Sequence, residues 1–476
     1  MSAPEVVVVG AGPGGISAAL EVARAGASVW VLDEYPRPGG QYFRQPAPGL
    51  TVEPDSSVLE HASEGRLRIK QAEEAGVRFL PQVMVWGAFA DGSLAILSEG
   101  KAEVLAPAKL ILAAGAHERP VAFPGWTLPG VITAGAAQAL VGGQGLLPGR
   151  RIMMAGTGPL QVAVAAQLVR AGGHLAGVLE ANSFGALLRL GARCWGQWER
   201  LWDGLRYWRT LRAAGVPLAF GRTVVRALGD GQLARVVTAA LDQNWKVIAG
   251  TEREIEVDTL CLGFWLAPNT KLARLLGCDV TYDPSRGGLV PAHTERMETS
   301  RPGVFAVGET AGIAGATAAE LQGRIAGIAA AQQLGKGNPA EAAARISAAR
   351  DELARELRFA RYLNDVFSVK PGLLDLITDE TVVCRCEEIT WGRWREERSE
   401  WATTLDAVRT TTRTGFGLCQ GNVCESLVGQ LLARETGKTM GELGSYHIRP
   451  PLKPITLGAL ADLGPRLPPP PKRMEH

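Results

Sequence analysis

The chain has 476 residues, 46% hydrophobic and 21% charged, which is the composition of an ordinary globular protein. This length is too great for one hydrophobic core, so we expect roughly two to four domains. The 50 basic and 48 acidic residues leave a net charge of +2, which gives no electrostatic reason to propose nucleic acid as a partner. No apolar run approaches the roughly 20 residues of a membrane helix, and no signal peptide is visible. We therefore expect no membrane span and a cytoplasmic protein, or one associated with a membrane through its complex.

The first elements have the pattern of a dinucleotide-binding βαβ unit. A β-branched run over residues 5–9 fits a buried parallel strand, and a glycine-rich turn and a helix follow it. Gly10, Gly12 and Gly15 have the spacing that permits a tight turn, approach of a pyrophosphate and close packing of helix on strand. The helix N-terminus offers free N–H groups to the phosphates. Asp33 ends the second strand, where a carboxylate can bind ribose hydroxyls.

Features further along the chain favour FAD over NAD at this first site. Pro38-Gly39-Gly40-Gln41 follows the acidic residue, as in two-dinucleotide flavoproteins. Gly308-Glu309 ends a late strand, where such proteins usually place Gly-Asp beside the flavin. The cofactor-binding residues predicted for the first site are Gly10, Gly12, Gly14, Gly15, Asp33, Glu34, Gly40, Gln41, Gly115, Gly308 and Glu309.

The same plan repeats from residue 151. A strand leads into Gly156 and Gly158, then a helix follows, then a strand that ends at Glu180. Gln161 occupies the third glycine position, where its side chain would hold helix and strand further apart. No arginine follows Glu180 closely, which argues against NADP. For this second site, NAD, an adenine nucleotide (ADP or ATP) and a vestigial pocket stay open, and an FMN at a subunit interface is a further alternative.

The segment 184–214 is predicted to be helical and is rich in Arg, Leu and Trp. Trp195, Trp198 and Trp202 fall on one helical face, which is typical of a core position. With the neighbouring arginines they could instead form a face that docks a partner. His117, which follows the turn at Gly115, is interpreted as a solvated turn histidine.

Strands are expected from about 216 to 265, and a helix of small residues from about 316 to 333. An Ala/Glu/Arg-rich helical linker is expected over 340–362. The proline-rich segment 465–476 is expected to be disordered or docked as an extended tail.

A compact module follows in which cysteines occur as two close pairs. The pattern is C-x-C, then 32 residues, then C-x4-C, and it can supply four thiolates to a small cluster at Cys384, Cys386, Cys419 and Cys424. A [2Fe-2S] cluster is favoured because the module is attached to a flavoprotein, and structural zinc is the alternative. A redox disulfide between Cys419 and Cys424 is a third interpretation, which the absence of cysteine from residues 39–44 weakens. The remaining cysteines, at 194, 261 and 278, are interpreted as small apolar core residues.

Several stretches resemble one family over nearly the whole chain. They are Leu32-Asp33-Glu34 with Pro38-Gly39-Gly40-Gln41, Ala116-His117-Glu118-Arg119-Pro120, Phe123-Pro124-Gly125-Trp126 through Val131, Cys384-Arg385-Cys386-Glu387-Glu388 and Cys419-Gln420-Gly421. They are similar to the FAD-binding A-type (alpha) subunits of octopine/nopaline oxidases, D-hydroxyproline dehydrogenases and hydrogen cyanide synthase. The resemblance implies a C-terminal [2Fe-2S] module of the bacterioferritin-associated ferredoxin type. It also implies a separate amine-oxidase-like FAD subunit that oxidises the substrate and passes its electrons to this chain.

The resulting prediction is an α/β fold: a two-dinucleotide-binding, glutathione-reductase-like Rossmann flavoprotein with a small helical [2Fe-2S] module. The expected domains are a FAD-binding domain over 1–120 and 286–365, a second nucleotide domain over 121–285, the [2Fe-2S] module over 378–440 and a docking or disordered tail over 441–476. The function expected is that of a redox subunit of a heteromeric dehydrogenase acting on an amino acid, imino acid or opine, with a quinone or carrier protein as acceptor. The alternatives are a stand-alone NADH-dependent ferredoxin-type reductase and a non-catalytic, flavin-stabilised assembly scaffold.

Overall fold

The computed structural model describes residues 4–50, 58–193 and 198–464. Its first sheet is parallel, with strand order β20-β7-β1-β2-β3. The strands are β1 (Val6–Val9), β2 (Val29–Leu32), β3 (Arg78–Leu80), β7 (Lys109–Leu112) and β20 (Val304–Ala306). Because all five strands run the same way, their carboxyl ends meet at one edge, where open α/β sheets bind their ligands.

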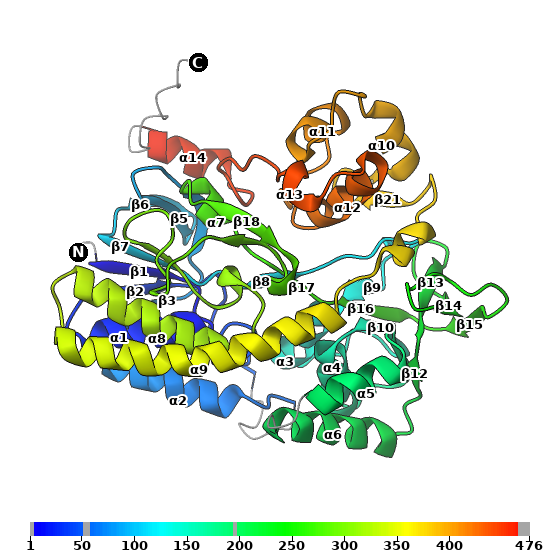
Figure 1. Ribbon diagram of the computed structural model, residues 1–476, viewed down its shortest axis with the longest axis horizontal. Coiled ribbons are helices and arrows are strands. Elements are labelled where there is room, and N and C mark those ends of the chain that lie inside the picture. The colour runs from blue at the N-terminus through cyan, green and yellow to red at the C-terminus, as the bar shows by residue number, and fades with distance from the viewer. Residues whose placement is uncertain (1–3, 51–57, 194–197, 465–476) are drawn as a thin grey trace.

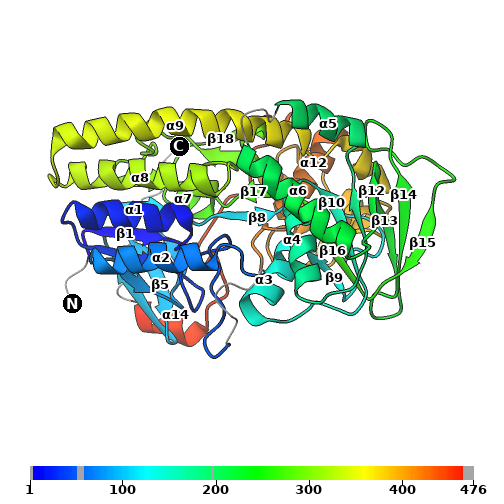
Figure 2. The same cartoon turned by 90° about the horizontal axis from the view of Figure 1, so that it is seen from below.

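Both faces of this sheet are covered, which explains why β1 is a continuous run of valines. One face packs against α1 (Pro13–Arg24) and α8 (Ala316–Gln333). The other packs against α7 (Lys271–Leu275) and an antiparallel meander of β4 (Met84–Ala88), β5 (Leu94–Ser98) and β6 (Lys101–Leu105). Helix α2 (Ala62–Glu74) completes the helical layer, as Figure 2 shows.

The second sheet repeats this plan with strand order β12-β11-β10-β16-β9. Its strands are β9 (Val131–Thr133), β10 (Ile152–Thr157), β11 (Leu175–Glu180), β12 (Leu218–Phe220) and β16 (Thr259–Phe264). Helices α3 (Ala134–Gln144), α4 (Pro159–Arg170) and α6 (Trp198–Ala213) cover one face, and α5 (Phe184–Arg193) lies beside them. The meander β13 (Arg222–Leu228), β14 (Arg235–Ala240) and β15 (Arg253–Glu256) covers the other face. The internal repeat predicted from the glycine motifs is thus confirmed.

A two-stranded antiparallel ribbon connects the two sheets. The chain leaves the first domain along β8 (Ala116–Glu118) and returns along β17 (Leu266–Pro268). Beyond α7 lie the hairpin β18 (Val280–Asp283) and β19 (Gly288–Pro291) and the 3-10 helices η1 (Pro284–Arg286) and η2 (Gly308–Ala311).

Helix α9 (Pro339–Val366) is longer than the predicted linker helix and is not a free linker. It begins at Asn338, whose side chain accepts hydrogen bonds from the first backbone N–H groups. Buried Ile346, Ala349 and Leu353 join the core of the first domain. Figure 1 shows α9 lying along α8 and then extending toward the second sheet.

The cysteine module is a small, mainly helical unit. It contains η3 (Pro371–Leu376), β21 (Val382–Cys384), β22 (Ile389–Thr390), α10 (Trp391–Glu397), α11 (Leu405–Thr412), α12 (Cys424–Thr436) and α13 (Met440–Leu443). Its apolar side chains are continuous with the core of the second domain, and the Trp126 indole N–H donates to the Val382 carbonyl at 2.8 Å. The module is therefore packed on the body of the protein.

The described part of the C-terminal segment is docked. The Leu452 N–H donates to the Trp86 carbonyl of β4 at 2.7 Å, and Ala459 and Leu463 of α14 (Leu457–Leu463) pack on the Trp86 side chain. The proline-rich stretch 465–476 lies outside the described residues. Within the described ranges, none of the helices combines the length and apolarity that crossing a bilayer requires.

Two interpretations of single side chains are wrong. His117 lies in β8, paired with β17, and burial lowers the pKa of its imidazole to about 4, so it is not a solvated turn histidine. Trp202 is 63% exposed on α6, so it is not a core residue, and its role in docking stays a prediction. Cys194 and Trp195 lie outside the described residues.

Candidate cofactor sites

The first glycine turn joins β1 to α1 at the carboxyl edge of the first sheet. A Cβ on Gly15 would lie 1.9 Å from the Gly10 carbonyl oxygen, so glycine is what allows α1 to pack against β1. Gly12 is the N-cap of α1, and a Cβ there would meet no atom within 4 Å. Space is therefore free beside the helix N-terminus, where a pyrophosphate would bind.

Asp33 lies beside this turn with part of its hydrogen-bonding capacity free. Its Oδ2 accepts from the Ala11 N–H at 2.6 Å, and its Oδ1 accepts from the Tyr35 N–H at 2.9 Å. A carboxylate offers about four acceptor positions, so about two are left for ribose hydroxyls. Burial raises the pKa of Asp33. The geometry fits the ADP half of FAD.

The segment after β2 closes over the same turn. The Gly39 N–H donates to the Ala11 carbonyl at 2.8 Å, and a Cβ on Gly40 would lie 2.7 Å from the Gly12 Cα. Gly14 also lies in close contact, since its Cβ would meet the Ala319 carbonyl at 3.1 Å. The backbone segments around the turn approach so closely that a side chain at Gly40 or Gly14 would crowd them.

Two predicted cofactor residues use their side chains in protein contacts instead. Glu34 forms an ion pair with Lys453 of the C-terminal segment. Gln41 is exposed, and its amide donates to the Tyr35 hydroxyl at 3.3 Å. Contact of either side chain with FAD stays a prediction.

The flavin half of the site is expected where β7 and β20 end. The Gly115 carbonyl accepts from the Asn269 N–H at 3.0 Å and from the Thr310 hydroxyl at 3.4 Å. Gly308 and Glu309 begin η2 directly after β20. Burial raises the pKa of Glu309 to about 7, well above its ordinary value of 4.5.

The buried Glu309 carboxyl should make the free energy of unfolding depend on pH. Between its ordinary pKa of 4.5 and the raised value of about 7, the folded chain keeps a proton that the unfolded chain releases. Stability from this group is therefore lost as the pH rises through that window. Glu309→Gln should stabilise the flavin-free protein by about 3 kcal/mol above the window and by little below it. Urea unfolding at both ends of the window measures the difference, and an equal difference at both would contradict the assignment.

The second glycine turn also brings its predicted residues together. The Glu180 carboxylate accepts from the Thr157 hydroxyl at 2.7 Å and the Asn182 N–H at 2.9 Å on Oε1. On Oε2 it accepts from the Gly158 N–H at 3.0 Å and the Gln161 amide at 2.9 Å. Burial raises the pKa of Glu180. Gly156 packs on β16, because a Cβ there would lie 2.1 Å from the carbonyl of the facing residue.

The module brings its four cysteines close to one another. The Cys386 and Cys419 sulfur atoms lie 3.6 Å apart. The Cys424 thiol is the main reason why the pKa of Cys384 falls to about 6, and the Cys386 thiol lowers it as well. Cys419 and Cys424 are both free thiols in the structure, and the thiol nearest to Cys419 by hydrogen bonding is that of Cys386. Among the described residues, no three or more His, Cys, Asp or Glu side chains form a group that could hold one metal ion.

Small residues and one aromatic ring surround these thiols. A Cβ on Gly417 would lie 2.5 Å from the Cys386 sulfur. The Tyr446 ring packs on Gly415 and Gly421, and its hydroxyl lies 4.0 Å from the Cys424 sulfur. Tyr446 was not predicted from the sequence, because it lies beyond the cysteine motif and has no local pattern of its own.

Helix α7 contacts both the first domain and the cysteine module. Asn269, just before it, bonds to Gly115 as described above. The Lys271 ammonium donates to the Cys419 carbonyl at 2.9 Å, and Arg274 pairs with Glu425 at 3.1 Å. Burial lowers the pKa of Lys271 to about 8. These cations were also missed by sequence reasoning, since nothing local links them to the cysteines.

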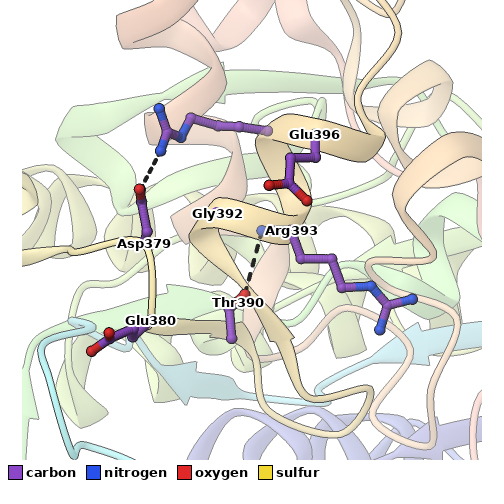
Figure 3. A pocket seen from close by; sticks show the side chains of 7 residues that line it. Asp379, Glu380, Thr390, Gly392, Arg393 and Glu396 are labelled. Carbon is purple, nitrogen blue, oxygen red and sulfur yellow. Dashed lines mark hydrogen bonds and ion pairs between the residues drawn. The ribbon is translucent and has the colours of Figure 1, made fainter.

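A shallow depression on the module is a separate feature (Figure 3). Its lining has no thiol and consists of Asp379, Glu380, Thr390, Gly392, Arg393, Arg395 and Glu396. Arg395 forms an ion pair with Asp379, and Glu380 and Arg393 point away from each other. Its arrangement supplies no group suited to redox chemistry.

Comparison with known proteins agrees with this geometry. The family model for pyridine nucleotide-disulphide oxidoreductases matches residues 4–335. The chain is 32% identical to an opine oxidase subunit from Rhizobium meliloti over 96% of its own length and 87% of the relative's. The chain therefore belongs to the pyridine nucleotide-disulphide oxidoreductase family of FAD-dependent oxidoreductases.

Two further similar proteins match the chain beyond residues 4–335. The hydrogen cyanide synthase subunit HcnB of Pseudomonas aeruginosa is 33% identical over 96% of this chain and 98% of that protein. The solved structure of L-proline dehydrogenase from P. horikoshii superposes with a TM-score of 0.70, at 19% identity, over 96% of this chain and 79% of that one. The predicted Rossmann flavoprotein fold is thus confirmed.

Proposed function

We propose that this chain is an electron-transfer subunit, carrying FAD and a [2Fe-2S] cluster, of a heteromeric dehydrogenase that oxidises an amino acid, imino acid or opine. The observation that carries the proposal is the position of α7. This helix follows β17, which pairs with β8 just after Gly115 of the first site. From α7, the Lys271 ammonium donates a hydrogen bond to the Cys419 carbonyl. Such a bridge supports electron transfer between a two-electron flavin bound at the first site and a one-electron cluster held by the thiols.

Four thiols attached to a flavoprotein support a [2Fe-2S] cluster over structural zinc. A [2Fe-2S] cluster takes four cysteine ligands, two on each iron. The sulfur atoms of Cys386 and Cys419 lie 3.6 Å apart, and Cys384 and Cys424 shift each other's pKa, so the four thiols are near neighbours. Zinc also takes four thiolates, but it has no redox chemistry and cannot accept an electron from a flavin. The pKa of Cys384 is lowered and that of Cys424 is raised, so these two thiols share a proton that metal binding would release.

The need for a partner rests on the relatives and on the chemistry of this chain. Relatives similar over nearly the whole chain are named as subunits of an oxidase and of a synthase. We propose that an amine-oxidase-like FAD subunit oxidises the substrate and that this chain passes the electrons to a quinone or carrier protein. The name of the opine oxidase relative suggests opines as the substrate class, and the name of a sarcosine oxidase relative suggests amino acids.

The purified chain should therefore show no turnover of such substrates alone with a dye acceptor. With the amine-oxidase-like subunit that co-purifies with it, substrate should bleach the flavin and cluster absorption of this chain in stopped-flow mixing. Cys424→Ala should stop transfer to the acceptor while bleaching of the flavin persists. Robust oxidation of a simple imino acid by this chain alone would refute the division of labour. Failure of substrate to reduce this chain in the assembled complex would refute the electron path.

A further inference from the structure

The second glycine turn is covered by aromatic side chains. A Cβ on Gly158 would lie 2.8 Å from atoms of the Trp265 indole and 3.5 Å from the Phe367 ring. In a working dinucleotide fold, this glycine is where the backbone approaches the pyrophosphate. The corresponding Gly12 of the first turn has no atom near its Cβ position. The indole thus occupies space that the first site leaves free.

Trp265 is held in place from the first domain. Its indole N–H donates to the Asn364 side chain of α9 at 2.6 Å. The amide of Asn364 in turn donates to the carbonyls of Ser285 at 2.8 Å and Ile313 at 2.9 Å. The φ angle of Trp265 is 73°, a left-handed conformation that costs a residue with a side chain on the order of 1–2 kcal/mol. Such a conformation persists only where its surroundings determine it.

The end of α9 lies over the same turn. The Asn182 amide donates to the Thr157 hydroxyl at 3.0 Å and to the carbonyl of Val366, the last residue of α9, at 3.1 Å. The C-terminal end of a helix carries partial negative charge, which disfavours a phosphate. Figure 1 shows α9 reaching from the first domain to the region of β10 and β16.

The ribose position is closed as well. The four hydrogen bonds to Glu180 use all of the roughly four acceptor positions of a carboxylate. Asp33 of the first site accepts two bonds and keeps the rest. A ribose hydroxyl at the second site would have to displace a buried donor and leave it without a partner, which costs about 1–3 kcal/mol.

We propose that the second dinucleotide motif of this chain is an interdomain lock closed to NAD(H), ADP and ATP, and that Trp265 is the residue that determines this specificity. The lock joins the second glycine turn to α9 and fixes the two domains relative to each other. Reducing equivalents then reach the flavin from a protein partner and not from NADH. The inference rests on this geometry and does not depend on the cysteine cluster.

Hydrogen exchange on the FAD-loaded full chain tests the lock. NADH at about 1 mM, the upper end of ordinary KM values, should leave exchange of residues 152–182 unchanged and should not bleach the flavin. Trp265→Ala should speed exchange at 152–161 and at the end of α9 at least about tenfold, the effect of losing roughly 1.4 kcal/mol. Trp265→Phe keeps a ring over Gly158 and should retain most of the protection.

A matched control is Trp30→Ala, which removes another half-buried indole from the first sheet and should not change exchange at the end of α9. Two results would overturn the proposal. One is saturable protection of 152–182 by NADH in the wild-type chain that Glu180→Ala abolishes. The other is unchanged exchange at the end of α9 in Trp265→Ala. Reduction of the chain by substrate through its partner would be unaffected by either result, so the lock and the proposed function fail separately.

Discussion

Cys424→Ala should remove nearly all iron and acid-labile sulfide from the purified chain while FAD stays bound. Cys424 is fully buried at the start of α12, so no solvent-derived ligand can readily replace it. The wild-type chain should contain about two iron and two sulfide per chain, as a [2Fe-2S] cluster requires. Metal analysis, sulfide assay and visible absorption measure the change, and the first glycine site keeps the flavin because it lies in a different domain.

Controls for this prediction come from the other described cysteines. Cys261 and Cys278 are buried far along the chain from the module, in the cores of the second and first domains respectively. Their replacement by Ala should leave iron and sulfide unchanged and cost roughly 1 kcal/mol each, from lost packing and, for Cys278, from its hydrogen bond with Thr299. Stoichiometric zinc without sulfide in the wild-type chain would show that the site is structural. Full iron content in Cys424→Ala would show that the ligand set is wrong.

Gly12→Val should give a folded protein that has lost FAD. The backbone of Gly12 is extended, with φ −79°, and no protein atom lies within 4 Å of a Cβ there, so a side chain fits the protein but enters the pyrophosphate space. Losing one or two hydrogen bonds to a charged phosphate should cost about 3 kcal/mol, which is roughly a hundredfold in affinity. Flavin absorbance per chain and titration of the apoprotein with FAD measure it.

Substitutions at two other glycines distinguish a loss of FAD binding from a loss of folding. Gly204 lies inside α6 with nothing within 4 Å of its Cβ position, so Gly204→Ala should keep full flavin content. Gly15→Ala should instead disturb folding, because its Cβ would lie 1.9 Å from a backbone oxygen. Full FAD occupancy in Gly12→Val would mean that the pyrophosphate binds elsewhere.

The first site was predictable because its signals are local. A strand, a glycine turn, a helix and an acidic residue follow one another within a few tens of residues, and each has a direct physical reason in the fold. Gly12, Gly15 and Asp33 consequently lie at the carboxyl edge where the sequence placed them. The spacing of the cysteines predicted two local groups, but it could not predict that the fold brings Cys386 to Cys419 and Cys384 to Cys424 across the two motifs.

The second site could not be judged from its motif. Gly156, Gly158 and Glu180 are where the pattern places them, yet what covers them comes from Trp265 and from the end of α9. Those contacts join segments far apart in the sequence and carry no period or spacing. The same limit explains His117, whose burial depends on strand pairing with β17.

The docked C-terminal segment makes the cysteine module a loop tethered at both ends. One end leaves α9, and the other returns to β4 through Leu452 and to Glu34 through Lys453. A unit held in this way samples a small volume, so its effective concentration beside α7 stays high even if contacts such as Lys271 with Cys419 open transiently. Electron exchange between the proposed flavin and cluster would then be a unimolecular event whose rate is independent of protein concentration. Cutting the chain after α13 would release the second anchor without removing any of the four cysteines.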